Sequence, residues 1–263
     1  TVLPAGQTAE QDLQQALDSI FKHPNVGPFI SKQLIQRLVT SNPSPAYVGR
    51  VAAVFANNGQ GARGDLAAVV KALLLDDEAR NGHMAAPQTF GKVKEPILRL
   101  AQFWRAFNAA KGNGRWDIAT DWNLQQEPLR APSVFNFFSP FYSQPCTLSQ
   151  AGLVAPELQL TTESTITHMS NLMTGYSLWA YKGMANAKPE QMLIDIEKEK
   201  ALAGDVNALL DRLNLLLLNG GMSSALRTAV SEHITPIAAT KPEERVTEAL
   251  ALIASSPEFA VQK

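Results

Sequence analysis

The sequence predicts an all-α protein, and three features of its 263 residues lead to that prediction. Apolar residues recur at helical spacing along most of the chain. No run with the alternation of a strand exceeds a few residues, so strands are expected to be nearly absent. One segment, about 129–160, is rich in aromatic residues and prolines and has neither period. We therefore expect an irregular multi-helix domain with one long non-periodic loop.

The first predicted helix covers residues 9–21, where Leu13, Leu17 and Ile20 fall on one face. Thr8 and Gln11 have the spacing of a capping box. Prolines at positions 28, 45 and 96 fit the first turns of later helices. Helices are predicted for residues 28–39, 45–55, 65–77, 96–110, 161–181, 189–201, 205–218, 223–234 and 243–254. We expect each apolar face to be buried.

Two segments end in a similar way. RGDLAAVVKALLLDDEAR and ERVTEALALIASSPEFA each place a long apolar helix before a turn that contains an acid, so that Glu78 matches Glu258. Common descent of two helical hairpins and the ordinary pattern of a helix end both explain this similarity.

The segment KGMANAKPE, near 182–190, has the composition of an exposed linker. It divides the chain into a helical domain of residues 1–181, which includes the aromatic loop, and a C-terminal helical subdomain of residues 182–263. The alternative is a single domain, in which the subdomain packs on the rest of the chain.

Composition excludes several functional classes. Lys and Arg number 23 against 24 Asp and Glu, so the net charge of −1 gives no electrostatic footprint for nucleic acid. No apolar run approaches the roughly 18–20 residues of a membrane span. Cys146 is the only cysteine, which excludes an intrachain disulfide and a multi-cysteine metal site. No metal site is predicted, and no cofactor is indicated.

Glu157, Glu163 and His168 are the candidate catalytic residues, because carboxylates and imidazole can share acid–base work or bind a divalent metal. The five-residue spacing of Glu163 and His168 is poor for a pair on one helix face. Glu163 is also explained as a first-turn acid that interacts with the helix dipole. Both interpretations remain open.

Arginines recur beside acids along the chain, and Arg130 lies at the start of the aromatic loop. Its guanidinium can hold the loop by binding backbone carbonyls or a carboxylate such as Glu157, or it can recognise an anionic ligand. The other members of this set are Arg37, Arg50, Arg63, Arg80, Arg99 and Arg105.

The aromatic residues of the loop, among them Phe135, Phe138 and Tyr142, have two interpretations. They fill the gap between helices, which we expect of Phe135 and Phe138, or they form a platform on which a ligand stacks. The same two interpretations apply to Trp104, Trp116, Trp122 and Trp179.

The words LRAPSVFNFFSP and GLVAPELQLTTES resemble the signature of the DUF1800 family of bacterial proteins. HPNVGPFISKQLIQRLVTSNPSPAYVGRVAAVF, RGDLAAVVKALLLDDEAR, GKVKEPILRL and SSPEFAVQK are similar to further blocks of the C-terminal half of that family. The family has no established activity to transfer. The resemblance implies an export signal and an N-terminal helical half that this sequence does not contain, and hence a location in the periplasm, at the cell surface or outside the cell.

The resemblance also implies partners. They are the N-terminal half of the same polypeptide, other copies of the chain, or a protein of the DUF1501 type. Our first hypothesis is therefore an exported binding or assembly protein. The alternative is a hydrolase or metal-assisted enzyme that acts on an envelope or extracellular polymer with acids near Glu157–His168. Whether the protein is an enzyme stays open at this point.

Overall fold

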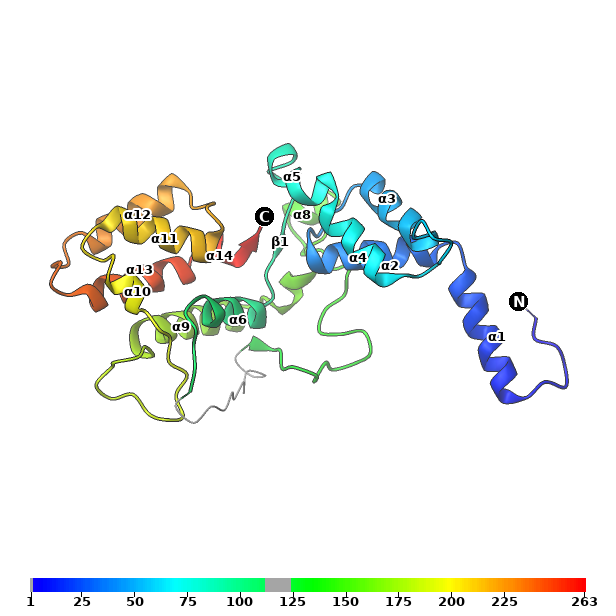
Figure 1. Cartoon of the computed structure of the whole chain (residues 1–263), viewed down its shortest axis with the longest axis horizontal. Coiled ribbons are helices and arrows are strands. Elements are labelled where there is room, and N and C mark those ends of the chain that lie inside the picture. Colours follow the sequence, from blue (N-terminus) through cyan, green and yellow to red (C-terminus); the bar gives the residue numbers. More distant parts are fainter. Residues whose placement is uncertain (1, 112–123) are drawn as a thin grey trace. The chain divides into compact units, whose positions relative to one another are not determined.

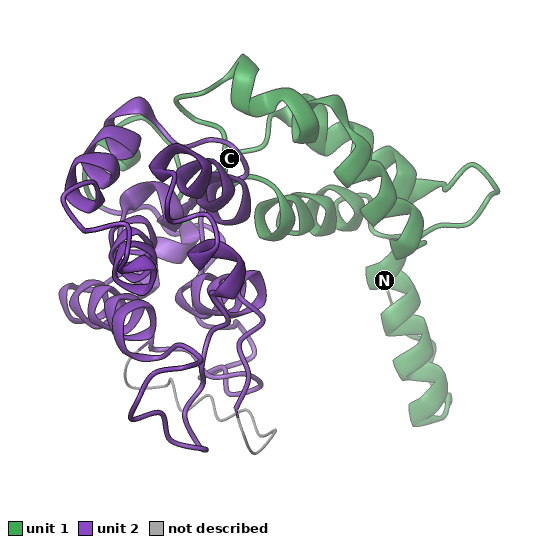
Figure 2. Ribbon diagram, turned by 60° about the vertical axis from the view of Figure 1, so that its left-hand side comes forward, with its two compact units in different colours: residues 1–92, 145–155, 263 green, residues 93–144, 156–262 purple. Residues whose placement is uncertain are grey.

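The computed structural model describes residues 2–111 and 124–263, and the prediction of an all-α protein is confirmed (Figure 1). The chain divides into two compact units (Figure 2). Unit 1 comprises residues 1–92, 145–155 and 263, and unit 2 comprises residues 93–144 and 156–262. The predicted linker at 182–190 lies within unit 2, and the division into 1–181 and 182–263 stays a prediction. Trp116 and Trp122 lie outside the described residues.

Unit 1 contains the helices α1 (Ala9–Lys22), α2 (Val26–Leu38), α3 (Pro45–Ala56), α4 (Leu66–Leu75), α5 (Asp77–Ala85) and α8 (Thr147–Gln150). Its core lies where α3 packs on α2 and α4. Tyr47 of α3 is fully buried there, and its hydroxyl donates a hydrogen bond of 2.6 Å to the Leu73 carbonyl. The other core residues are Ile35, Val39, Val51, Phe55, Val69 and Leu73.

Helix α1 confirms the predicted helix and its capping box but corrects the predicted burial. Leu13, Leu17 and Ile20 are exposed, and α1 contributes no buried residue. Periodicity selects the apolar face of a helix, but it does not say what covers that face. The end of α1 is held by Phe21, whose ring lies 6.1 Å from the ring of Phe55.

The predicted helix 65–77 is α4 in the structure, which ends at Leu75, and α5 follows it directly. Asp76 separates α4 from α5, and its carboxylate accepts a hydrogen bond from the Glu78 N–H at the start of α5. Arg50 donates two hydrogen bonds of 2.7 Å to the same carboxylate. Among the apolar residues of α4, Val69 and Leu73 are buried as expected, whereas Leu66 and Leu74 are exposed.

Unit 2 contains α6 (Pro96–Ala106), the 3-10 helix η1 (Pro156–Leu160), α9 (Glu163–Trp179), α10 (Glu197–Lys200), α11 (Val206–Leu218), α12 (Ser224–Ile234), α13 (Pro242–Ala254) and α14 (Pro257–Ala260). Two short strands, β1 (Lys92–Val93) and β2 (Val261–Gln262), pair with each other. Helix α13 is central, because it packs on α9, α11 and α12. Its Arg245 is buried and donates to the carbonyls of Ile237 and Ala203 at 2.7 and 2.8 Å.

The prediction of a helix at 189–201 is wrong except for α10. Met192, Ile194 and Ile196 are buried, whereas the residues between them are only partly buried. This alternation with a period of two is that of an extended segment. Leu193 accordingly exchanges backbone hydrogen bonds with Ala110, at 3.0 and 3.1 Å.

The similarity between Glu78 and Glu258 extends to their hydrogen bonds. Ser44 caps α3 and donates its N–H and its hydroxyl to the two carboxylate oxygens of Glu78. Ser223 caps α12 and donates the same two groups to Glu258. We call these two pairs the Ser–Glu clasps. The first clasp joins the start of α3 to α5, and the second joins the start of α12 to α14. Both units therefore contain the same local arrangement.

Candidate functional site

The candidate acids near the aromatic loop do not form one compact group. Glu157 is buried in η1, whereas Glu163 is exposed at the first position of α9. Five residues along α9, the Nδ1 atom of His168 lies 3.1 Å from the hydroxyl of Ser164. Glu163 and His168 are five residues apart and therefore face different sides of the helix. Among the described residues, no group of three His, Cys, Asp or Glu side chains could hold a metal ion. The catalytic roles stay predictions.

The aromatic loop is only partly packed. Phe138 is 3% exposed, as predicted for a residue that fills a gap, but Phe135 is 81% exposed. The expectation that Phe135 is a core residue is therefore wrong, since local composition does not determine which ring of a loop points inward. Tyr142 is half-buried. Arg130 is exposed, and its Nη1 donates to the Glu127 carboxylate at 2.9 Å. The binding roles of these residues stay predictions.

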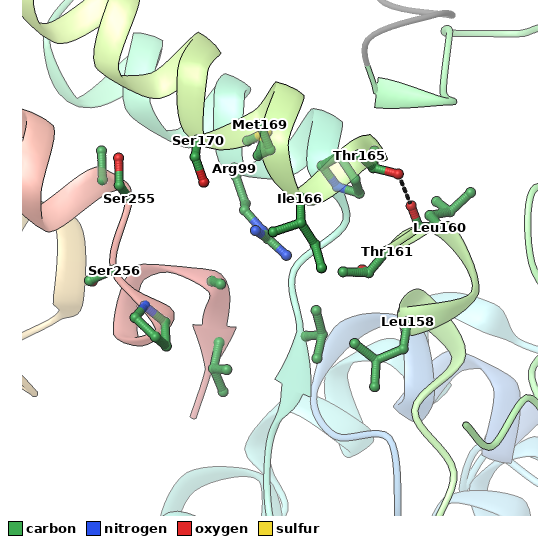
Figure 3. A pocket seen from close by; sticks show the side chains of 16 residues that line it. Arg99, Leu158, Leu160, Thr161, Thr165, Ile166, Met169, Ser170, Ser255 and Ser256 are labelled. Atoms are coloured by element: carbon green, nitrogen blue, oxygen red, sulfur yellow. Dashed lines mark hydrogen bonds between the residues drawn. The ribbon is translucent and has the colours of Figure 1, made fainter. Parts of the chain in front are cut away.

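A pocket with a volume of about 280 Å³ lies among α6, η1, α9 and α14 in unit 2. Figure 3 shows the guanidinium group of Arg99 projecting from α6 into this space. We call it the Arg99 pocket. Its other lining residues are Val93, Pro96, Leu158, Leu160, Thr161, Thr165, Ile166, Met169, Ser170, Ala254, Ser255, Ser256, Pro257, Ala260 and Val261.

Arg99 is a half-buried cation without a counter-charge. Its Nε donates to the Lys94 carbonyl at 3.1 Å. No carboxylate of the described residues pairs with it, and no acceptor among them meets its Nη1 and Nη2 groups. Burial lowers the pKa of Arg99, because the charged form loses hydration, but an arginine stays protonated at neutral pH. Two forked N–H donor groups are therefore available to a ligand.

The hydroxyls of the pocket differ in their availability. Thr165 donates to the Leu160 carbonyl at 2.7 Å, and Ser256 donates to the Ile253 carbonyl at 2.7 Å. Ser255 lies 3.4 Å from the hydroxyl of Thr174. The hydroxyl of Ser170 has no hydrogen-bond partner within the described part of the chain. In Figure 3 it points from α9 toward the side of the pocket that holds Arg99.

A second buried cation lies close to this pocket. Lys94 is 9% exposed, its Nζ donates to Gln102 Oε1 at 2.8 Å, and the ring of Phe259 lies 4.6 Å from the same atom. Burial, and then the positive charge of Arg99, lower the pKa of Lys94 to about 8. Because Lys94 and Arg99 repel each other and have no ion pair in the described residues, the local potential is positive.

From the sequence, Arg99 is one member of the arginine set, and anion recognition is an alternative given for Arg130 beside a structural role. Glu95 stands four residues before Arg99, a spacing that favours an ion pair on a helix. In the structure Glu95 accepts a hydrogen bond of 2.7 Å from Gln126 instead. The contact between Glu95 and Gln126 thus leaves Arg99 without a carboxylate partner. No signal within the sequence identifies this contact.

The comparisons with known proteins give a family but no function. Residues 1–261 match the family described as "Protein of unknown function (DUF1800)". No curated protein and no solved structure matches the chain. None of the described helices has both the length and the apolar character of a membrane span. Since the match covers nearly the whole sequence, the chain belongs to the DUF1800 family.

Proposed function

We propose that the protein is a binding component that captures a small anionic ligand in the Arg99 pocket. The observation that carries this proposal is the half-buried guanidinium of Arg99, whose Nη1 and Nη2 groups meet no acceptor of the described residues. These two groups open onto the pocket, and a hydrogen bond that involves a charged group contributes about 1.5–3 kcal/mol. An anion in the pocket can accept hydrogen bonds from both groups.

The shape of the guanidinium favours a carboxylate or a phosphate. Both have two oxygens at the spacing of the Arg fork, so two parallel hydrogen bonds can form. The free hydroxyl of Ser170 supplies a further donor. The charge of Lys94 adds to the attraction without lining the pocket.

The remaining walls favour a ligand with an apolar part. Leu158, Ile166, Met169, Pro257 and Val261 line the pocket, and Ile166 is 54% exposed. A ligand body that covers such side chains gains about 25 cal/mol for each Å² of apolar surface removed from water. The best match is therefore a monocarboxylate with a short aliphatic or aromatic group.

Calorimetric titration tests this proposal with octanoate, benzoate, acetate and inorganic phosphate as probes. We expect octanoate or benzoate to bind more tightly than acetate. The substitution Arg99→Gln should weaken binding by about 10- to 100-fold, the equivalent of one charged hydrogen-bonding group. Arg105→Gln, at an exposed arginine of the same helix, is the matched control and should leave the affinity unchanged. Absence of binding, or equal binding by the Arg99→Gln protein, would refute the proposal.

A binding role is compatible with the first hypothesis from the sequence, an exported binding or assembly protein. Export, the N-terminal half or further copies of the chain as partners, and a DUF1501-type partner are implications of the family resemblance and stay predictions. The alternative, a hydrolase that uses Glu157, Glu163 and His168, also stays a prediction.

A further inference from the structure

The C-terminal end of α9 carries an exposed tryptophan beside a second pocket in unit 2. Trp179 is 62% exposed, and the adjoining pocket has a volume of about 410 Å³. This volume falls within the about 300–1,000 Å³ typical of small-ligand sites. Asn171, Gly175 and Trp179 recur every four residues, so they lie along one side of α9 and line the pocket together. We call this site the Trp179 pocket.

The aromatic residues at the Trp179 pocket differ in burial and in what they contact. Trp104 is buried, and its ring meets that of Tyr176 edge to face at 5.3 Å and 88°. Tyr176 thereby belongs to the core and forms part of the pocket wall. The indole of Trp179 is not needed for this packing and presents its surface to solvent.

The backbone leaves room beside the indole. Gly175 lies one helical turn before Trp179, and a Cβ atom at this position would meet no atom within 4 Å. Glycine inside a helix costs about 0.5–1 kcal/mol relative to alanine. Packing does not require glycine at position 175. The absence of a side chain there keeps the pocket open next to the indole ring.

Polar groups stand around the indole. The amide of Gln191 is held in place, because its Nε2 donates to the Trp179 carbonyl at 2.9 Å. Asn171 and Glu190 are exposed, and neither side chain has a hydrogen bond within the described residues. An amide offers both donors and acceptors, and a carboxylate offers acceptors, so together they match groups that both donate and accept, such as hydroxyls.

We propose that the Trp179 pocket binds a neutral sugar unit of a glycan. A pyranose ring has an apolar face of C–H groups, which stacks on an aromatic ring, and an edge of hydroxyls, which require donors and acceptors. Trp179 supplies the ring, and Asn171, Glu190 and the fixed Gln191 supply the polar edge. This site is separate from the Arg99 pocket and does not depend on the proposed anion binding.

A quaternary ammonium ion is the competing ligand, since cations also stack on indole rings. Recognition of that kind uses a cage of several aromatic faces, whereas Trp179 is the only exposed ring among the described aromatic residues that line this pocket. A trimethylammonium group has no polar hydrogen, so it leaves the acceptors of the two amides unused. We therefore assign the pocket to a sugar, and the experiment includes choline.

The test uses the whole chain with chitobiose, cellobiose and maltose as probes, and with choline as the competing ligand. Saturation-transfer NMR identifies which ligand protons contact the protein, and calorimetry gives the affinity. We expect at least one disaccharide to bind with its ring C–H protons saturated most strongly. Trp179→Ala should weaken binding about tenfold or more, the loss of a stacking partner, and Trp179→Phe should retain part of the affinity.

Gly175→Gln fills the pocket without removing a contact of the fold, and it should also abolish binding. Phe29→Ala, at an exposed aromatic residue of α2, is the matched control and should bind like the unaltered protein. The proposal is overturned if no disaccharide binds, if choline binds instead, or if the Trp179→Ala and Gly175→Gln proteins bind sugar as tightly as the unaltered chain. Anion binding at Arg99 is measured separately, so its failure leaves this result unaffected.

Discussion

Lys94 gives the most quantitative prediction, because a charge is buried without a counter-charge of the described residues. Its pKa falls from 10.5 to about 8 in the folded protein. Each pKa unit corresponds to about 1.4 kcal/mol, so the shift of about 2.5 units corresponds to roughly 3 kcal/mol. The folded state is destabilised by this amount when the lysine is charged.

The direction of the pH dependence follows from linkage. Below pH 8 both the folded and the unfolded chain carry the proton, and the full penalty is present. Between pH 8 and 10.5 the folded state has lost its proton while the unfolded state keeps it. The contribution of Lys94 to the free energy of unfolding therefore rises through this range, and the penalty is gone above pH 10.5.

Lys94→Met removes the charge at every pH. At pH 7 we expect the variant to be more stable by about 2 kcal/mol, since roughly 3 kcal/mol of penalty is removed and about 1 kcal/mol is lost with the hydrogen bond to Gln102. The difference between variant and unaltered protein should then fall by about 3 kcal/mol between pH 7 and 10.5. Urea titrations at several pH values measure it.

Lys71→Met, at an exposed lysine of α4, is the control and should give a difference near zero at every pH. A difference for Lys94→Met that stays constant with pH would show that Lys94 titrates alike in the folded and unfolded states. In that case the argument for an uncompensated positive charge beside Arg99 fails.

Three further predictions concern the loop, a clasp and the candidate acids. Phe138→Ala should destabilise the protein by about 3–5 kcal/mol, the range for a buried Phe, whereas Phe135→Ala should change stability by less than about 0.5 kcal/mol. A loss below about 1 kcal/mol for Phe138→Ala in a denaturant titration would contradict its burial. Glu258→Ala should lower the free energy of unfolding by about 1–2 kcal/mol, because Ser223 loses two acceptors. Glu258→Gln should lower it by less. Equal stability of both variants and the unaltered protein would show that the clasp contributes nothing. If the hydrolase alternative is right, calorimetry with divalent ions should detect binding that is lost in Glu163→Ala and His168→Ala, and heat that persists in both variants would exclude these two residues as ligands.

The sequence predicts helix starts well, because their determinants are local. Thr8 caps α1 as predicted, and α12 begins at Ser224, one residue after its predicted start, with Ser223 as the cap. Burial was harder to predict, as Leu13 shows, because it depends on what lies opposite a helix. The sequence predicts a helix around Ile194 instead of an extended segment, because the run with a period of two is short and lies between helical patterns.

The site was less predictable than the fold. Its central feature is the charge of Arg99, which has no ion-pair partner among the described residues. Such a feature depends on the position of every nearby carboxylate in the folded chain. Glu95 is close to Arg99 in sequence, but its carboxylate accepts a hydrogen bond from the amide of Gln126, which is 31 residues from Glu95 in the sequence. The sequence leaves two interpretations of Trp179, a core residue or a ligand platform, and its exposure beside the buried Trp104 distinguishes them.

The Ser–Glu clasps have a consequence for the order in which the chain folds. Each joins residues separated by 34 or 35 positions, and everything enclosed between them is one helix, one turn and a second helix. Closing a loop of this length costs little more entropy than closing a shorter one, because the cost grows only with the logarithm of length. We therefore expect each segment to close early from contacts within its own stretch, before contacts between residues more distant in the sequence form.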